Sequence, residues 1–451
     1  MASAEISCPS TEAMPVAAPS LRITFTWTLL GNVVYALCQW GMISSLAKLG
    51  TTAAVGQFAL ALAITAPVFM LTNLQLRGIQ ATDARSTFEF GDYFTVRAAG
   101  TYIVLIVVFL VLAVSRYGRS TCFIVMLLAV AKAIESFTDV IAGLLQKYER
   151  LDQIAIGMML KGGFSVILFT AAYAYWHSVV AASASLCLTW LAVFLAYDLQ
   201  LARRLLKGKG TFLTLKVNSL LQLIKLAAPL GFVMALNSLN ANIPRYVLQR
   251  YRGASDLGIF AALAYLVIAV GLIANALGQS AVVRLSRSFA DGRTREFARL
   301  LKRMSFMGLA IAGAGVTLAI MFGHAALRLL YGTVYATHLS LLILLIATSG
   351  VTAVAAFLGF GMTAARQFRA QVPIIAVTVA TCAGLAIALT PRWGLMGSGF
   401  AILIASLVQV LGSLIVLLGA VRRSAARNET TDVDVQLAKR EAVALFGNVG
   451  E

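Results

Sequence analysis

Three ionisable residues stand inside an otherwise apolar stretch of this sequence. Lys132, Glu135 and Asp139 lie within AKAIESFTDVIAG, residues 131–143, and the residues on both sides are almost wholly apolar. At about 100° per residue the three share one face of a helix. Each charge at the centre of a membrane helix costs roughly 2.5 to 3.5 kcal/mol, so it must pair or meet water. Lys132 and Glu135 can pair at i and i+3, and Asp139 then needs a partner from another helix.

Two interpretations of this charged stripe are open. It could be a structural cluster of polar contacts that holds the helix in its bundle. Alternatively, it could be the wall of a cavity in which Glu135 and Asp139 take up protons. A structural cluster does not require three ionisable groups, because Ser or Asn could make the same interhelical contacts. The stripe therefore favours a functional site with Lys132 as a substrate contact.

Weaker polar stripes occur on other apolar stretches. Asn32 and Gln39 share one face of the first, Lys225 belongs to a face of the seventh that also carries Asn218 and Gln222, and Asn275 lies on the eighth. Singly, each is more often an ordinary interhelical hydrogen bond. Jointly they indicate a polar cleft between the two halves of the chain.

Three further cations have two interpretations each. Lys161 lies about two turns from the end of the fifth apolar stretch, so it either lines the cavity or extends to the membrane interface. Arg245 follows a proline near the outer end of the seventh stretch, and Arg77 closes the second at the inner face. We predict that both arginines lie at a cavity mouth, with interfacial anchoring as the alternative.

The composition identifies the class of protein that holds these residues. Of 451 residues, 60% are hydrophobic and 12% are charged, and the mean hydropathy is +0.87. Such values exclude a water-soluble globular chain of this size. The net charge of +18 comes from cations in short loops between apolar runs, which indicates membrane topology and contact with anionic lipid rather than nucleic acid.

The sequence offers no site for covalent chemistry. Five cysteines and three histidines are scattered without metal-ligand spacing, and no GxxxxGK[ST] motif occurs. No acidic pair or histidine cluster lies in an outer loop of useful length. We therefore expect neither an enzyme nor a cofactor or metal.

Twelve apolar windows are long enough to cross a bilayer. They fall near 23–46, 54–76, 98–115, 121–145, 154–175, 178–200, 217–241, 256–283, 304–323, 339–361, 372–390 and 395–420. Lipid admits only helices or closed barrels, and these windows are too continuously apolar for barrel strands. We predict an all-α polytopic membrane protein with twelve transmembrane helices. Most lysines and arginines lie in the tails and even-numbered loops, which predicts that both termini are cytoplasmic.

An internal repeat predicts two lobes. TTAAVGQFALALAI from Thr51 and GASDLGIFAALAYL from Gly253 each place a glycine two residues before a phenylalanine, and a basic, phenylalanine-containing loop follows each. Six spans per half is an even number, so the halves are related by a pseudo-two-fold axis along the membrane normal. We predict lobes at 22–209 and 210–421, a disordered cytoplasmic tail at 1–21 and a cytoplasmic tail at 422–451.

Several long pieces resemble the Wzx-type polysaccharide biosynthesis proteins of the multidrug/oligosaccharidyl-lipid/polysaccharide exporter superfamily, which includes MATE and MviN-like proteins. They are LGNVVYALCQWGMISSLAKLG, VGQFALALAITAPVFMLTNLQLRGIQATDA, GLLQKYERLDQIAI and APLGFVMALNSLNANIPRYVLQRYRGASDLGIFAALAYL. The resemblance implies a V-shaped fold of two lobes. It also implies a flippase that moves undecaprenyl-diphosphate-linked oligosaccharide from the cytoplasmic to the periplasmic leaflet of a bacterial inner membrane.

The resemblance also carries expectations about the cavity and the partners. Related lipid flippases have cavity arginines in the first helix, but this chain has only Arg22 at its edge. Diphosphate binding is therefore expected at Lys132, Lys161, Lys225 and Arg245. The implied partners are membrane lipid, a lipid-linked O-antigen, capsule or exopolysaccharide unit, a polysaccharide polymerase and a chain-length regulator, with the protein itself a monomer. The alternative functions are a MATE-type drug antiporter and a structural scaffold.

Overall fold

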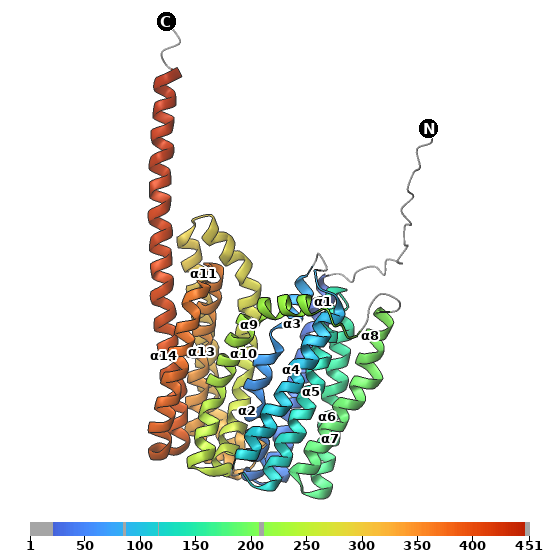
Figure 1. Cartoon of the computed structure of the whole chain (residues 1–451). Coiled ribbons are helices and arrows are strands. Elements are labelled where there is room, and N and C mark those ends of the chain that lie inside the picture. The colour runs from blue at the N-terminus through green and yellow to red at the C-terminus, as the bar shows by residue number, and fades with distance from the viewer. Residues whose placement is uncertain (1–20, 84–86, 116, 207–211, 447–451) are drawn as a thin grey trace, which may run out of the picture.

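The computed structural model describes residues 21–83, 87–115, 117–206 and 212–446, and within these ranges it contains helices and no strands. Most helices run side by side along one direction (Figure 1). The tail predicted at 1–21 lies outside the described residues except for Leu21, which begins the first helix. The chain is thus all-α, as predicted.

The first half of the chain forms eight α-helices and one π-helix. They are α1 (Leu21–Leu49), α2 (Thr52–Asn73), α3 (Leu76–Thr82), α4 (Phe90–Val114), α5 (Arg119–Lys147), α6 (Leu151–Trp176), α7 (Val179–Val193), η1 (Phe194–Asp198) and α8 (Leu199–Leu205). The second half contains α9 (Val217–Tyr251), α10 (Gly253–Ala290), α11 (Thr294–Leu330), α12 (Thr333–Ala336), α13 (Leu339–Ala364) and α14 (Phe368–Phe446).

Ten helices of the described chain are long and apolar enough to cross a membrane. The prediction of a multi-pass membrane protein is therefore confirmed. The charged helix α5 is not among the ten, and one of the ten is a 55-residue stretch, Arg369–Arg423, that contains a sharp bend.

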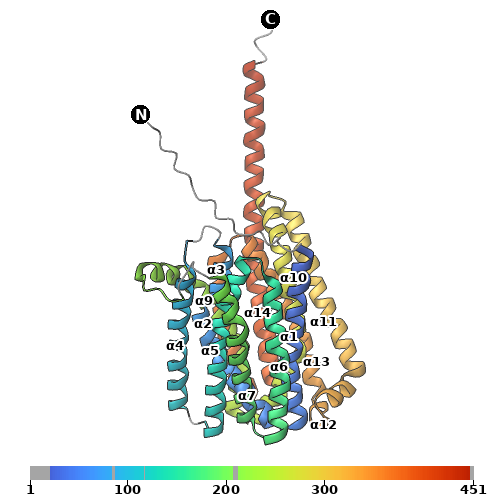
Figure 2. The same ribbon diagram turned by 90° about the vertical axis from the view of Figure 1, so that its right-hand side faces the viewer.

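That bend divides α14 into two helices. Gly394 has φ 56° and ψ −131°, which no α-helix contains. The hydroxyls of Thr390 and Ser398 are 2.8 Å apart, whereas eight residues of straight helix would separate them by about 12 Å. The chain therefore reverses at Gly394. The second limb continues as helix beyond the bundle to Phe446, where a tail was predicted (Figures 1 and 2).

The second apolar window ends differently from our expectation. Leu74 and Gln75 have φ of 52° and 53°, the left-handed region that non-glycine residues rarely adopt, and this break separates α2 from α3. Arg77 therefore lies in the first turn of α3. The prediction that it closes the second helix is wrong, because the chain turns before reaching it.

The third membrane helix begins eight residues before the predicted window. Glu89 and Asp92 form a capping box, in which each side chain accepts from the backbone N–H of the other residue, and α4 starts at Phe90. The segment expected to be an amphipathic loop thus includes the first two turns of α4. As a result Arg97 lies inside the bundle.

The two halves meet through reciprocal glycine contacts between α2 and α10. Gly56 faces the backbone of Ala254, Gly258 faces the carbonyl of Thr52, and the hydroxyls of Thr52 and Ser255 are hydrogen-bonded. Glycine allows the two backbones to approach closely, because a Cβ would occupy the space of the partner. The glycines are those that the sequence repeat aligned.

Other contacts between the halves are unequal on the two sides. Gly231 of α9 packs against Leu71 and Leu74, and α9 runs along α2. In contrast, the hydrogen bonds from α1 to the second half lie near its C-terminal end, where Trp40 donates to Tyr331 and Ser44 donates to the Leu330 carbonyl. The halves are therefore held along the α2–α9 side and at one end of the α1 side.

We expect Gly56→Ala to destabilise the protein by about 1–3 kcal/mol, because the added methyl collides with the α10 backbone. Gly313→Ala is the matched control, since a Cβ there meets no atom within 4 Å. A helical Gly→Ala change in open space is neutral or stabilising by about 0.5–1 kcal/mol. Thermal unfolding in detergent measures both variants, and equal melting temperatures would show that the contact is not tight.

Candidate functional site

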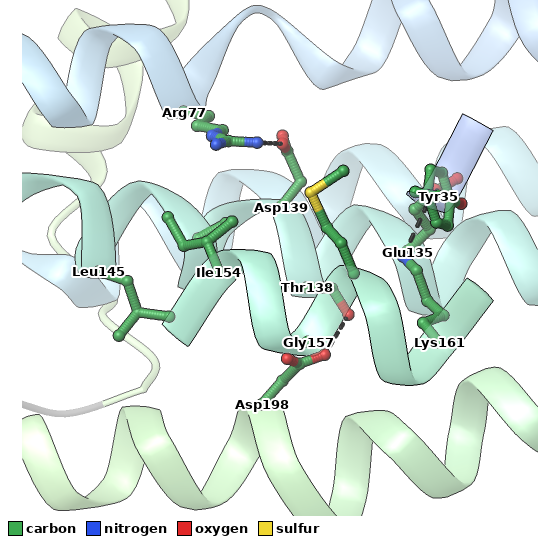
Figure 3. Close-up of a pocket in the computed structure, with 12 residues that line it drawn as sticks. Tyr35, Arg77, Glu135, Thr138, Asp139, Leu145, Ile154, Gly157, Lys161 and Asp198 are labelled. Carbon is green, nitrogen blue, oxygen red and sulfur yellow. Dashed lines mark hydrogen bonds and ion pairs between the residues drawn. The ribbon is translucent and has the colours of Figure 1, made fainter. Parts of the chain in front are cut away.

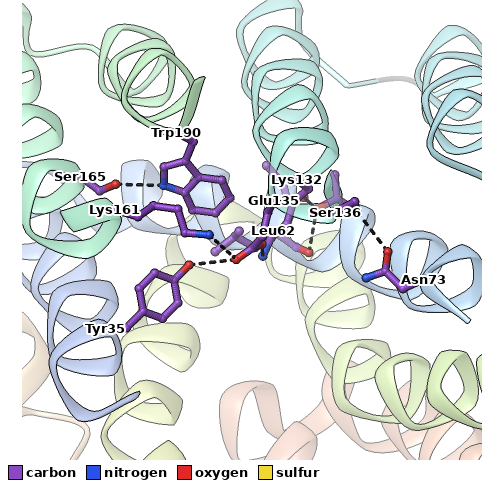
Figure 4. A network of polar contacts seen from close by, with 11 residues as sticks. Tyr35, Leu62, Asn73, Lys132, Glu135, Ser136, Lys161, Ser165 and Trp190 are labelled. Atoms are coloured by element: carbon purple, nitrogen blue, oxygen red, sulfur yellow. Dashed lines mark hydrogen bonds and ion pairs between the residues drawn. The ribbon is translucent and has the colours of Figure 1, made fainter. Parts of the chain in front are cut away.

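Glu135 of α5 is the centre of a polar network in the first half (Figure 4). Its carboxylate accepts hydrogen bonds from Lys132 at 2.6 Å and from the Tyr35 hydroxyl of α1 at 3.0 Å. The ammonium of Lys161, from α6, lies 3.5 Å from the same carboxylate. The expected pair between Lys132 and Glu135 is confirmed, and the network joins three helices.

Aromatic rings surround Lys161. Its ammonium lies 4.8 Å from the centre of the Trp190 ring and 5.4 Å from that of Tyr35, and Lys132 lies 5.5 Å from the Trp190 ring. Such cation–π contacts contribute about 2 kcal/mol when they are desolvated. The indole N–H donates to Ser165 at 2.9 Å, which fixes the ring. Lys161 points into the bundle with only 7% of its side chain exposed, so the interfacial alternative is wrong.

Asp139 finds its partners on neighbouring helices, as expected. Arg97 of α4 lies 3.0 Å from its carboxylate and Arg77 of α3 lies 3.7 Å away. Arg97 also donates to Asn73 at the end of α2, and its side chain is 1% exposed. Arg77 donates through Nε to Gln146 at 3.1 Å, on the same face of α5. Asp139 therefore ties α3 and α4 to α5.

A pocket of about 120 Å³ opens between these groups (Figure 3). This volume is large enough for several water molecules. The pocket lies within the first half of the chain, between α1, α3, α5, α6 and η1. Its lining consists of Tyr35, Arg77, Glu135, Thr138, Asp139, Ala142, Leu145, Ile154, Gly157, Met158, Lys161 and Asp198.

The ion pairs leave this region with surplus positive charge. Glu135 and Asp139 each bridge two cations, so neither carboxylate is free. Even with Asp198, which has no ion pair in the described part of the chain, the cations exceed the carboxylates. The site can therefore compensate an anion. The four cations are Arg77, Arg97, Lys132 and Lys161.

Three predicted residues are not part of this network. Asn32 and Asn275 are exposed and donate to carbonyls of their own helices, at 2.7 Å to Thr28 and 3.1 Å to Gly271. Lys225 is exposed on α9, and no ion pair involves it within the described ranges. None of the three lines the pocket of the first half, and their place in a cleft between the halves stays a prediction.

The two remaining predicted residues lie closer to the network. Gln39 is one turn from Tyr35 on α1 and interacts with its hydroxyl. Arg245 of α9 donates to Asn242 at 3.0 Å. Tyr265 of α10 is within electrostatic range of Lys132 in one half and of Arg245 in the other. Lys132 and Arg245 thus approach the same tyrosine from opposite halves.

Sequence reasoning missed three important members of the site. Arg97 was assigned to a loop, although the capping box before it signals a helix that starts at Phe90. Asp198 fell inside the sixth apolar window as a lone acid, and that isolation was itself a signal of function. Trp190 could not be recognised, because an aromatic residue in an apolar helix has no distinguishing pattern.

Comparison with known proteins gives a consistent result. The family model described as polysaccharide biosynthesis protein matches residues 23–289, more than half of the chain. The capsular polysaccharide biosynthesis protein CapF of Staphylococcus aureus is 28% identical over 396 residues, which cover 86% of this chain and 96% of that protein.

Two solved structures share the fold. The lipid II flippase MurJ in an inward closed conformation has a TM-score of 0.70 at 12% identity, over 92% of this chain and 93% of that chain. An inward-facing multidrug resistance MATE family transporter of the MOP superfamily has a TM-score of 0.63 at 15% identity, over 89% and 96%. At these identities the likeness concerns the fold alone.

We expect Arg97→Met to destabilise the protein by about 1.5–3 kcal/mol, because Asp139, whose side chain is 32% exposed, loses the closer of its two charged partners. Arg293→Met is the matched control, since the Arg293 pairs with Asp291 and Glu296 are half exposed and contribute about 0–1 kcal/mol. Thermal unfolding in detergent compares them. Adding Asp139→Asn to Arg97→Met should restore part of the loss, and no restoration would argue against the ion pair.

Proposed function

The chain belongs to the polysaccharide biosynthesis protein family, and from this premise we propose that it moves a lipid-linked oligosaccharide across the membrane. It is a multi-pass membrane transporter rather than an enzyme. The proposed substrate is an undecaprenyl-diphosphate-linked repeat unit of an O-antigen, capsule or exopolysaccharide. The proposed direction is from the cytoplasmic to the periplasmic leaflet of a bacterial inner membrane.

The surplus of cations in the first half is the observation that carries this proposal. A diphosphate brings negative charge into a low-dielectric region, where cations must compensate it. Glu135 and Asp139 each hold two cations in place, so the network is positive before any substrate arrives. A cationic drug would meet repulsion at the same place.

Exposure separates the cations that can contact the substrate from those that support the site. The side chains of Lys132 and Arg77 are 29% and 37% exposed, whereas Lys161 and Arg97 are almost fully buried. We assign diphosphate contact to Lys132 and Arg245, which approach Tyr265 from the two halves, and initial capture to Arg77. Lys161 and Arg97 contribute their charge from within the bundle.

The proposed architecture has twelve helices in two six-helix lobes, at 22–209 and 210–421. The ten apolar helices become twelve when α5 is included and α14 is divided at Gly394. The contacts of Gly56 with Ala254 and of Gly258 with Thr52 support a pseudo-two-fold axis between α2 and α10, because the sequence repeat relates each residue to its counterpart.

The unequal contacts between the lobes support a mechanism of alternating access. The bonds of Trp40 with Tyr331 and of Thr52 with Ser255 close one end of the molecule. With both termini in the cytoplasm, this end faces the periplasm. Rocking of the lobes would break these bonds and open the outer side. The protein acts as a monomer in this proposal, with a polysaccharide polymerase and a chain-length regulator as partners.

The membrane potential is a sufficient energy source for the proposed transport. Moving one negative charge outward through an inside-negative potential of about 100 mV yields about 2.3 kcal/mol. Proton uptake by Glu135 and Asp139 is the alternative coupling from the sequence, and it stays a prediction. Each of these carboxylates lies between two cations.

We expect Lys132→Gln and Arg245→Gln each to lower export about tenfold or more, because a charge-assisted contact contributes about 1.5–3 kcal/mol. Surface polysaccharide, measured in cells that depend on this chain, should fall while lipid-linked oligosaccharide accumulates in the inner leaflet. The control is Lys216→Gln, whose exposed pair with Glu89 lies outside the site. Equal export by all three variants would reject the assignment.

Dye efflux by the wild type would instead favour a drug antiporter.

A further inference from the structure

Asp198 is a buried carboxylate that the proposed function does not use. It is the last residue of the π-helix η1 and is 5% exposed. Its side chain lines the same pocket as Glu135 and Asp139, on the opposite wall (Figure 3). The hydroxyl of Thr138, from α5, donates to it at 2.9 Å. Asp198 therefore combines burial with access to the hydrated pocket.

The surroundings of Asp198 differ from those of the other two pocket carboxylates. Glu135 and Asp139 are each bound by two cations, whereas the residues described here include no ion pair to Asp198. Lys161 is the cation that acts on it electrostatically, and the ammonium of Lys161 is bound to Glu135. A neutral hydroxyl is thus its only hydrogen-bond donor among the described side chains.

Local backbone structure brings Asp198 to the pocket wall. Short π-helices within longer helices are rare and occur frequently at functional sites. Here η1 lies between α7 and α8 and ends at Asp198. Gly157 of α6 gives the carboxylate room, since a Cβ there would lie 3.3 Å from Oδ1 of Asp198 and 3.2 Å from the Tyr197 ring.

We propose that Asp198 is the carboxylate that binds and releases a proton in the transport cycle, while Glu135 and Asp139 serve as counter-ions of the four cations. A desolvated carboxylate that meets only a neutral donor favours its protonated form. A carboxylate between two cations favours its ionised form. The role in transport rests on the proposed function, but proton binding at Asp198 does not depend on it.

Lys161 provides a route for release. It lies four residues after Gly157 on α6, about 6 Å along the helix axis, so its side chain can reach Asp198 once its contact with Glu135 breaks. The approaching ammonium stabilises the carboxylate, and the proton passes from Asp198 to water in the pocket. The charged and titratable groups that face this pocket with Asp198 are Tyr35, Arg77, Glu135, Asp139 and Lys161. Beside Asp198 lie Tyr197, Asp152 and Arg150.

Infrared difference spectroscopy of the full chain in lipid nanodiscs tests the proton site directly, when both pH values compared lie well above the ordinary carboxyl pKa of about 4, so that exposed carboxylates stay ionised throughout. The wild type should show the carbonyl band of a protonated carboxylic acid, and Asp198→Asn should abolish it. Asp139→Asn is the matched control that should retain the band, because Asp139 pairs with Arg77 and Arg97 and not with Lys161. The proposal is overturned if the wild type lacks the band, if Asp198→Asn retains it or if Asp139→Asn removes it.

A second variant protects the test against misfolding. Thr138→Val keeps the carboxyl group but removes its hydroxyl donor, so the band should remain and shift in frequency. An unshifted band would contradict the assignment.

Export of lipid-linked oligosaccharide in cells under an imposed pH gradient then tests the role in transport. Asp198→Asn should remove the pH dependence of export, and a retained dependence would overturn that role. If the wild type moves no such substrate, the proposed function fails while the infrared result stands.

Discussion

The need to pair every charge inside the apolar bundle determines how the first half is built. Glu135 contacts residues of α1 and α6, and Asp139 contacts residues of α3 and α4, so both carboxylates connect these helices to α5. An uncompensated charge at this depth costs several kcal/mol, so five helices share one arrangement that satisfies both carboxylates. The pocket lies between the two clusters because its walls are the pairs themselves.

Much of the fold was predictable from the sequence, and the failures have physical causes. Apolar length identified the ten long apolar helices, whereas the twelve-helix arrangement stays a prediction, and helical periodicity placed Lys132 beside Glu135 correctly. Helical periodicity could not identify Arg97 as the partner of Asp139, because the capping box of α4 overrides the polar composition of the segment. The π-helix that ends at Asp198 leaves no mark in the pattern of apolar residues.

The polar residues of the other spans show a second limit. Asn32 and Asn275 occur at positions that suggest a common cleft, which stays a prediction, and each amide donates to the carbonyl one turn before it. A short amide side chain can satisfy itself on its own helix, and the sequence alone does not reveal which partner it takes. The ionised residues were better guides, since no carbonyl of their own helix can compensate a full charge.

The difference between the two sides of the lobe boundary has a consequence for how a lipid could enter. The two halves are in contact along the α2–α9 side of their boundary, and α1 with α10 forms the opposite side. Separation of the halves would therefore expose the space between them on the α1–α10 side only. A polyprenyl chain that stays in the bilayer while its headgroup is carried would thus pass between the halves on the α1–α10 side alone.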